Sequence, residues 1–178
     1  MIGIGSAERL AQFLATALQD LVRRLGSEPN ILHCGEAQGS EVVAVSVEFG
    51  NDRVRCSLGL IGESRLFSRL SPPPKPDDPE YLTDWACELA NQATGCLRNL
   101  VRVHGLALAA RVPRISTVES VRPSAESRHH RIPIMVGIDD MVLEAWIDVD
   151  APADLDINEL PDERVATEMP ASGDVLLF

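Results

Sequence analysis

A long amphipathic segment in the middle of the chain limits the folds that are open to it. From residue 80 to residue 103, apolar residues recur every three or four positions, which is the period of an α-helix with one buried face. Gly105 follows where a glycine commonly ends a helix. We therefore predict one long helix here, with Leu89, Ala93 and Leu100 on its buried side.

A second helix is predicted near the N-terminus. Residues 7–25 show the same apolar period. Ser6 is a suitable N-cap residue, because its side chain can accept a hydrogen bond from a free backbone N–H. Gly26 stands where a C-terminal glycine cap is expected, and Pro29 prevents the helix from continuing.

Two β-hairpins are predicted, one on each side of the central helix. Residues 41–49 are rich in β-branched side chains, and after a turn at 50–52 the chain runs back through 53–62. Residues 131–138 and 141–149 form a second such pair. In its return strand, alternate side chains face opposite sides of the sheet. One side carries Val142, Glu144, Trp146 and Asp148, and the other carries Leu143, Ala145, Ile147 and Val149.

The connections between these elements are less regular. Residues 63–70 could form a short helix. The proline-rich stretch 71–79 is expected to be a stiff, irregular connector, because its prolines lack N–H donors. Residues 106–117 are expected to contain one or two strands, and residues 120–130 a loop.

These elements predict an α+β fold with two layers, in which two long helices pack on a largely antiparallel sheet. The chain of 178 residues is long enough for one such domain, which we place at residues 1–150. Residues 151–178 carry seven acidic residues and one arginine, with little periodicity. We predict an acidic C-terminal tail that is loosely attached to the domain.

Charge and hydropathy exclude several classes of function. The formal net charge is −11, whereas a nucleic-acid-binding protein needs a basic face for the phosphates. No apolar run approaches the roughly 20 residues of a membrane helix, and the N-terminus lacks the pattern of a signal peptide. We therefore expect a cytoplasmic protein that binds neither nucleic acid nor membrane.

Cysteine and histidine residues give no sign of a metal site or a redox centre. Cys34, Cys56, Cys87 and Cys96 are scattered, without a CxxC pair, and are interpreted as small buried or half-buried thiols. The four histidines have no partner at metal-ligand spacing. No metal and no cofactor of the protein's own is predicted.

One flank of the central helix carries an unusual set of residues. At helical spacing, Asp84, Glu88, Asn91 and Gly95 point away from the predicted core. A glycine inside a helix costs roughly 1 kcal/mol relative to alanine. If a partner docks here, the missing side chain at Gly95 permits close approach. Alternatively, the flank is ordinary solvated surface, and Gly95 is tolerated or serves packing within the domain.

The sequence around this flank resembles a known family. Residues 87–113, CELANQATGCLRNLVRVHGLALAARVP, resemble the central helix and following strand of the CheX/CheC family of chemotaxis phosphatases. That family carries an E-x-x-N motif, which Glu88 and Asn91 match, and then the glycines and proline matched by Gly95, Gly105 and Pro113. The N-terminal helix, the first hairpin and the closing strands fall in the same order.

The resemblance implies a phosphatase for the aspartyl phosphate of a CheY-type response regulator in two-component signalling. A single E-x-x-N copy indicates the CheX-like type, and such proteins are typically homodimers. Asn91 would orient the attacking water, and Glu88 would pair with the regulator's active-site lysine. Asp84 and Gly95 would belong to the partner-binding face. The required Mg²⁺ would be held by the regulator.

Two further functions remain open. The chain could be a CheX-like binding module that docks a receiver domain or another signalling protein without turnover. It could also be a structural component, because flagellar switch proteins share the related fold. The sequence departs from the family at two points. Cys96 stands where a basic residue often follows the glycine, and Arg114 follows Pro113 where threonine is common.

Overall fold

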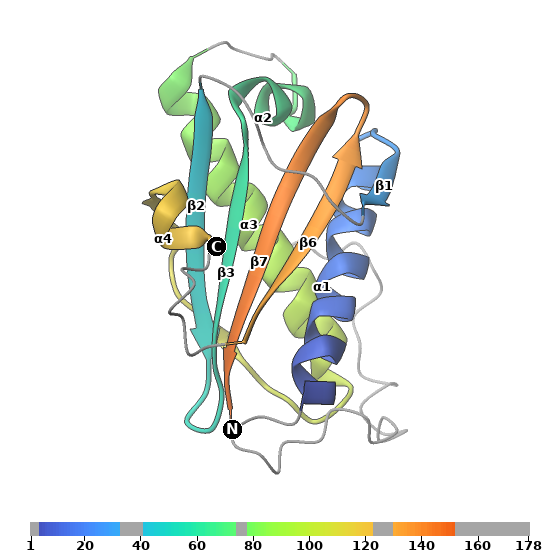
Figure 1. Cartoon of the computed structure of the whole chain (residues 1–178), viewed down its shortest axis with the longest axis vertical. Helices are drawn as coiled ribbons and strands as arrows, with labels where there is room; N and C mark the ends of the chain where they lie inside the picture. Colours follow the sequence, from blue (N-terminus) through green and yellow to red (C-terminus); the bar gives the residue numbers. More distant parts are fainter. Residues whose placement is uncertain (1–3, 33–40, 74–77, 123–129, 152–178) are drawn as a thin grey trace.

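The structure is a computed structural model that describes residues 4–32, 41–73, 78–122 and 130–151. Four helices and seven strands make up the described part of the chain (Figure 1). The helices are α1 (Ile4–Arg24), α2 (Ser64–Leu70), α3 (Pro79–Arg102) and α4 (Val118–Val121). The strands are β1 (Pro29–Leu32), β2 (Val42–Gly50), β3 (Arg55–Glu63), β4 (Ala109–Ala110), β5 (Arg114–Ser116), β6 (His130–Ile138) and β7 (Met141–Asp150).

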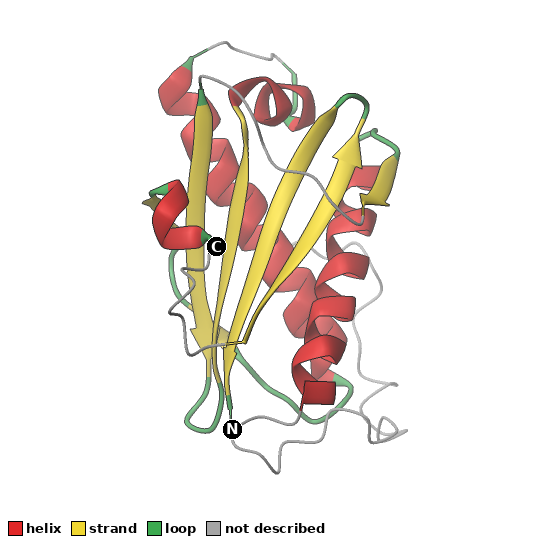
Figure 2. Ribbon diagram, viewed as in Figure 1, coloured by secondary structure: helices red, strands yellow, loops and turns green. Residues whose placement is uncertain are grey.

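The strands form one antiparallel sheet in the order β1-β6-β7-β3-β2-β4, with β5 also paired to β2. The β2–β3 and β6–β7 hairpins are joined in the middle of the sheet through β3 and β7. Helices α1 and α3 lie side by side on one face, and α4 lies on the other (Figure 2). The predicted α+β architecture, with two long helices on a largely antiparallel sheet, is confirmed.

The main core lies between the sheet and the two long helices. The β7 side chains alternate between the two faces as predicted, and the set Leu143, Ala145, Ile147 and Val149 is the one buried in this core. Fully buried side chains come from α1, α3 and the central strands, and include Leu10, Leu14, Leu18, Leu58, Leu60, Leu89 and Leu97. Burial of this apolar surface is the main stabilising contribution to the position of α3.

Helix α3 begins and ends at local signals in the sequence. The Asp78 side chain accepts a hydrogen bond from the Glu80 N–H at 3.1 Å, and Pro79 occupies the first helical position. Pro79 therefore starts the helix, which corrects the expectation that the whole proline-rich stretch is irregular. Gly105 ends the helical segment with a φ of 74°, as predicted, and its N–H bonds to the Arg102 carbonyl.

Several elements differ from the sequence-based prediction. Strand β1 was not predicted; it has four residues, and its pairing with β6 is a tertiary contact that local periodicity does not reveal. Ser6 lies within α1 instead of capping it. The short helix α4 replaces the start of the predicted loop. Leu100 is only half-buried, whereas Leu89 and Ala93 are fully buried as predicted.

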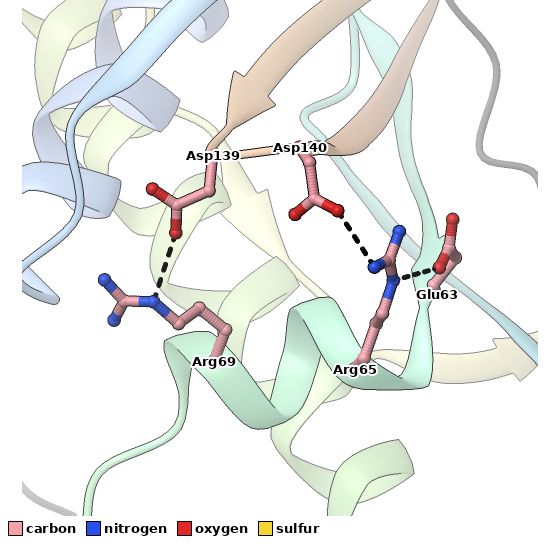
Figure 3. Close-up of polar contacts among 5 residues, drawn as sticks. All are labelled: Glu63, Arg65, Arg69, Asp139 and Asp140. Carbon is pink, nitrogen blue, oxygen red and sulfur yellow. Dashed lines mark hydrogen bonds and ion pairs between the residues drawn. The ribbon is translucent and has the colours of Figure 1, made fainter.

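Helix α2 contacts the β6–β7 turn through two arginines (Figure 3). Arg65 pairs with Glu63 and with Asp140, the latter at 3.1 Å, and Arg69 pairs with Asp139 at 3.3 Å. The Glu63 side chain is only partly exposed, whereas Asp139 and Asp140 in the turn are solvent-exposed. Ion pairs of this kind are worth about 0–1 kcal/mol each. They orient α2 without contributing much to stability.

A small second core lies under α4 on the other face of the sheet. Ala44, Ile61 and Val121 are buried there, with Trp146 packed against them. The close approach requires Gly59, because a Cβ at that position would lie 2.3 Å from the Val121 Cγ1 atom.

Within the described residues, no helix is long and apolar enough to cross a membrane. The predicted acidic tail lies outside the described residues apart from Ala151, so the domain boundary at residue 150 stays a prediction.

Candidate docking face on helix α3

The structure places the predicted flank residues together on the side of α3 that faces away from the core. Asp84, Glu88 and Asn91 are exposed, and Gly95 is half-buried. Leu89 lies on the opposite side of the helix and is fully buried. The predicted exposure of Glu88 and Asn91 is therefore confirmed.

An open groove runs along this face, between α3 and the segment that follows it. The helix contributes Asp84, Cys87, Glu88, Asn91 and Arg98 to the groove. The other wall is formed by residues 110–113, at the junction of β4 and β5. Gly95 does not line the groove. The Glu88 carboxylate and the Asn91 amide of the E-x-x-N motif therefore line the same solvent-accessible groove.

Glu88 is held in place by a residue that was not predicted. The Gln92 Nε2 atom donates a hydrogen bond to the Glu88 Oε1 atom at 2.7 Å. The two residues are four positions apart, which makes them neighbours on the surface of a helix. That spacing could have identified Gln92 from the sequence. The contact reduces the number of orientations that the exposed Glu88 carboxylate samples.

Gly95 has no role in packing within the described domain. A Cβ added at this position would have no heavy atom within 4 Å, apart from the backbone of its own helix and its chain neighbours. The internal-packing explanation for Gly95 is therefore excluded. Close approach by a partner and simple tolerance of glycine remain as explanations.

The second wall of the groove is fixed by arginines. The Arg98 Nε atom donates to the Leu108 carbonyl from the helix side. Glu48 on β2 accepts hydrogen bonds from Arg111 at 3.0 Å and from Arg114 at 2.7 Å. Between these two arginines, the Val112 side chain is 87% exposed. Sequence reasoning did not identify this wall, because it depends on pairing between β2 and the distant β4–β5 segment.

The cysteine thiols do not supply a nucleophile to this face. Burial raises the pKa of the Cys87 thiol, and the charge of Asp84 raises it further. Burial also raises the pKa of Cys96, against an opposing effect of Arg24. The thiolate is the reactive form of cysteine, so a raised pKa makes these side chains poor nucleophiles at neutral pH. The groups left for chemistry are the carboxylate and the amide.

The described part of the chain contains no cluster of three or more histidine, cysteine, aspartate or glutamate side chains arranged to hold a metal ion. Asp84 and Glu88 are one helical turn apart, and their exposed carboxylates are suited to pairing with a cation on another protein. Asn91 can donate and accept hydrogen bonds without carrying charge. This combination can orient a partner and a water molecule.

Comparison with family models gives no match, and comparison with curated proteins gives no relative. Solved structures do share the fold. CheX from Vibrio vulnificus superposes with a TM-score of 0.67 at 12% identity, covering 80% of this chain and 99% of that one. A CheC-like superfamily protein from Shewanella sp. PV-4 gives 0.63 at 16% identity, covering 80% and 97%.

A third structure of the same fold contains a partner. It is the complex of CheX and CheY with BeF3 and Mg²⁺ from Borrelia burgdorferi. It gives a TM-score of 0.56 at 16% identity, covering 80% of this chain and 96% of that one. At these identities the likeness concerns the fold. The chain therefore has the fold of CheX and CheC-like proteins.

Proposed function

We propose that this protein docks on a phosphorylated CheY-type receiver domain and accelerates hydrolysis of its aspartyl phosphate. The observation that carries the proposal is the joint exposure of Glu88 and Asn91 on one groove-facing side of α3. The fold supports it, since a CheX of this fold is known in complex with CheY. The role in chemotaxis or in another two-component pathway is part of the same proposal.

In the proposed reaction, a water oxygen attacks the phosphorus in line with the bond to the receiver's aspartate. That bond breaks, the aspartate leaves as a carboxylate, and inorganic phosphate is released. Mg²⁺ bound by the receiver neutralises the phosphoryl oxygens, so this protein needs no cofactor of its own. Its contribution is to position the water, and positioning alone can lower such a barrier by several kcal/mol.

Asn91 is the group that positions the water. Its amide can hydrogen-bond the water without placing another negative charge beside the phosphoryl group. A carboxylate at the same place would repel that group. Asn91 is exposed and one helical turn from Glu88, so both can act on one receiver.

Glu88 fixes the docking angle by pairing with the lysine of the receiver's active site. The Gln92 hydrogen bond restricts the carboxylate before the receiver arrives, which lowers the entropy lost on binding. Asp84 extends the acidic surface by one helical turn. Gly95 lies one helical turn beyond Asn91, outside the groove, and its missing side chain lets the two molecules approach closely there.

A binding module without turnover is the alternative. The strongly exposed apolar side chain of Val112 beside the groove suits protein docking whether or not hydrolysis follows. A phosphate-release assay separates the two functions. Each CheY-type receiver of the source organism is phosphorylated with a small phosphodonor, and its dephosphorylation is followed with and without this protein. Catalysis predicts an accelerated rate that saturates with receiver; binding alone predicts an unchanged or slowed rate.

We further propose that the protein is a homodimer that leaves the α3 face open. The β1 strand ends the sheet on the side opposite the groove, and an exposed edge of this kind is a site for pairing with another chain. Light scattering at high micromolar concentration is expected to give twice the mass of the chain. A monomer mass under those conditions would contradict the dimer but would leave the phosphatase proposal in place.

A further inference from the structure

The second wall of the groove contains a β-bulge. Phe49 on β2 pairs with Ala110, and Ser46 pairs with Arg114. The two β2 residues in between, 47–48, therefore lie opposite three residues, 111–113. One extra residue in a strand pushes part of it out of the ladder and redirects its side chains.

Contacts on both sides hold the bulge in place. The Arg111 N–H donates to the Glu48 carbonyl at 2.8 Å, and the Arg111 and Arg114 side chains bind the carboxylate of the same residue. Pro113 has no N–H to leave unpaired and has a fixed φ. The backbone hydrogen bond and the fixed φ of Pro113 restrain the bulge, which reduces the conformational entropy lost when a partner covers it.

The bulge places an apolar side chain in water beside the E-x-x-N pair. Val112 is 87% exposed, against 68% for Ile115 and 42% for Ile31, the other exposed large apolar residues of the described chain. Val112 lines the same groove as Glu88 and Asn91. An exposed apolar side chain beside charged, hydrogen-bonding groups is suited to be covered by a protein partner.

We infer that Val112 on this bulge is the apolar anchor for the receiver domain, and that it sets the affinity while Glu88 and Asn91 supply register and chemistry. The inference rests on the proposed function. The arginines that line the groove are already engaged, Arg98 with the Leu108 carbonyl and Arg111 with a carboxylate on β2. The occupant is a receiver because the two exposed carboxylates of the groove, Asp84 and Glu88, complement the cationic side chain beside a phosphorylated aspartate. In the proposed complex, the receiver surface next to its active site covers Val112.

The test is Val112→Ser in the full chain, measured for dephosphorylation over a range of receiver concentrations. Binding is measured separately with the Mg²⁺- and beryllofluoride-activated receiver. Loss of the buried anchor is expected to raise both KM and Kd about tenfold. The turnover at saturation should stay unchanged, because Val112 does not reach the reacting atoms. Ile115→Ser is the matched control, because Ile115 is also strongly exposed but does not line the groove, and it should leave both constants unchanged.

Three results would overturn the inference. In the first, Val112→Ser has wild-type KM and Kd while the wild-type protein is active; the anchor is then wrong and the proposed function stands. In the second, Val112→Ser turns a dimer into a monomer in light scattering without changing receiver affinity, which assigns the bulge to a second copy of this chain. In the third, the wild-type protein neither binds nor dephosphorylates any receiver, and the proposed function fails together with the anchor.

Discussion

Arg122 forms a bidentate ion pair with Glu144 on the sheet face opposite the two long helices. The Nε and Nη2 atoms of Arg122 donate to the two carboxylate oxygens at 2.9 and 2.7 Å. The Trp146 Nε1 atom donates to the same carboxylate at 2.7 Å. The Glu144 side chain is buried, and Arg122 directly follows α4. This contact fastens α4 to the sheet.

Removing Arg122 is expected to destabilise the domain strongly. Arg122→Ala removes this ion pair from the buried Glu144 carboxylate, and breaking a buried pair costs about 3–5 kcal/mol. Urea unfolding followed by far-UV circular dichroism measures the effect. Arg65→Ala, which breaks the solvent-exposed contacts of α2, is the control and is expected to cost about 0–1 kcal/mol. Similar losses in the two variants would contradict the assigned role of the buried pair.

Alkaline pH is expected to destabilise the domain through Cys56. Burial, with added repulsion from Asp148 and Asp150, raises the pKa of this thiol from 9.0 to about 12. The unfolded chain therefore loses the proton first, so stability is intact below pH 9.0 and falls as pH rises toward 12. The slope from this group is about 1.4 kcal/mol per pH unit.

Cys56→Ala isolates that contribution to the pH dependence. The variant loses some packing at all pH values, but its free energy of unfolding should fall less steeply than that of the wild type above pH 9.0. Denaturant titrations at several pH values give both curves. Parallel curves over this range would show that Cys56 ionises equally in the folded and unfolded states.

The alkylation rates of two cysteines on α3 can show which face of the helix a receiver covers. Cys87 lines the groove and Cys96 does not, although both are half-buried. The beryllofluoride-activated receiver is expected to slow alkylation of Cys87 several-fold and to leave Cys96 unchanged. Proteolytic cleavage after Glu88 separates the two sites for mass spectrometry. Protection of Cys96 instead of Cys87 would place the partner on another face.

Substitutions of Gly95 are expected to have opposite effects on the stability of the domain and on receiver binding. Gly95→Ala should stabilise the domain by up to about 1 kcal/mol, because the added methyl meets no other side chain. Gly95→Leu should leave the fold intact but weaken receiver binding at least tenfold, since the larger side chain occupies the docking face. Thermal unfolding and binding to the activated receiver test both. Full receiver affinity in the leucine variant would mean that the glycine is only tolerated.

Local patterns in the sequence predicted most of the fold. The period of α3, the glycine at its end and the two hairpins are local features, and the structure confirms them. The positions of Glu88 and Asn91 follow directly from helical spacing. Elements that depend on distant pairing were missed. Strand β1 forms by pairing with β6, and the bulge at Val112 results from the register of β4 and β5 against β2. The sequence therefore did not predict the second wall of the groove, which residues 110–113 form.

The most direct test of the proposed function is Asn91→Ala, assayed for turnover and for binding with a receiver that the wild-type protein dephosphorylates. Asn99→Ala is the matched control, because it removes another exposed asparagine from the same helix outside the groove. If Asn91 orients the attacking water, kcat should fall on the order of 100-fold or more while Kd for the beryllofluoride-activated receiver changes less than threefold. The Asn99 variant should match the wild type in both. Wild-type kcat in Asn91→Ala would remove this helix from the mechanism and leave the likeness to CheX as one of fold alone.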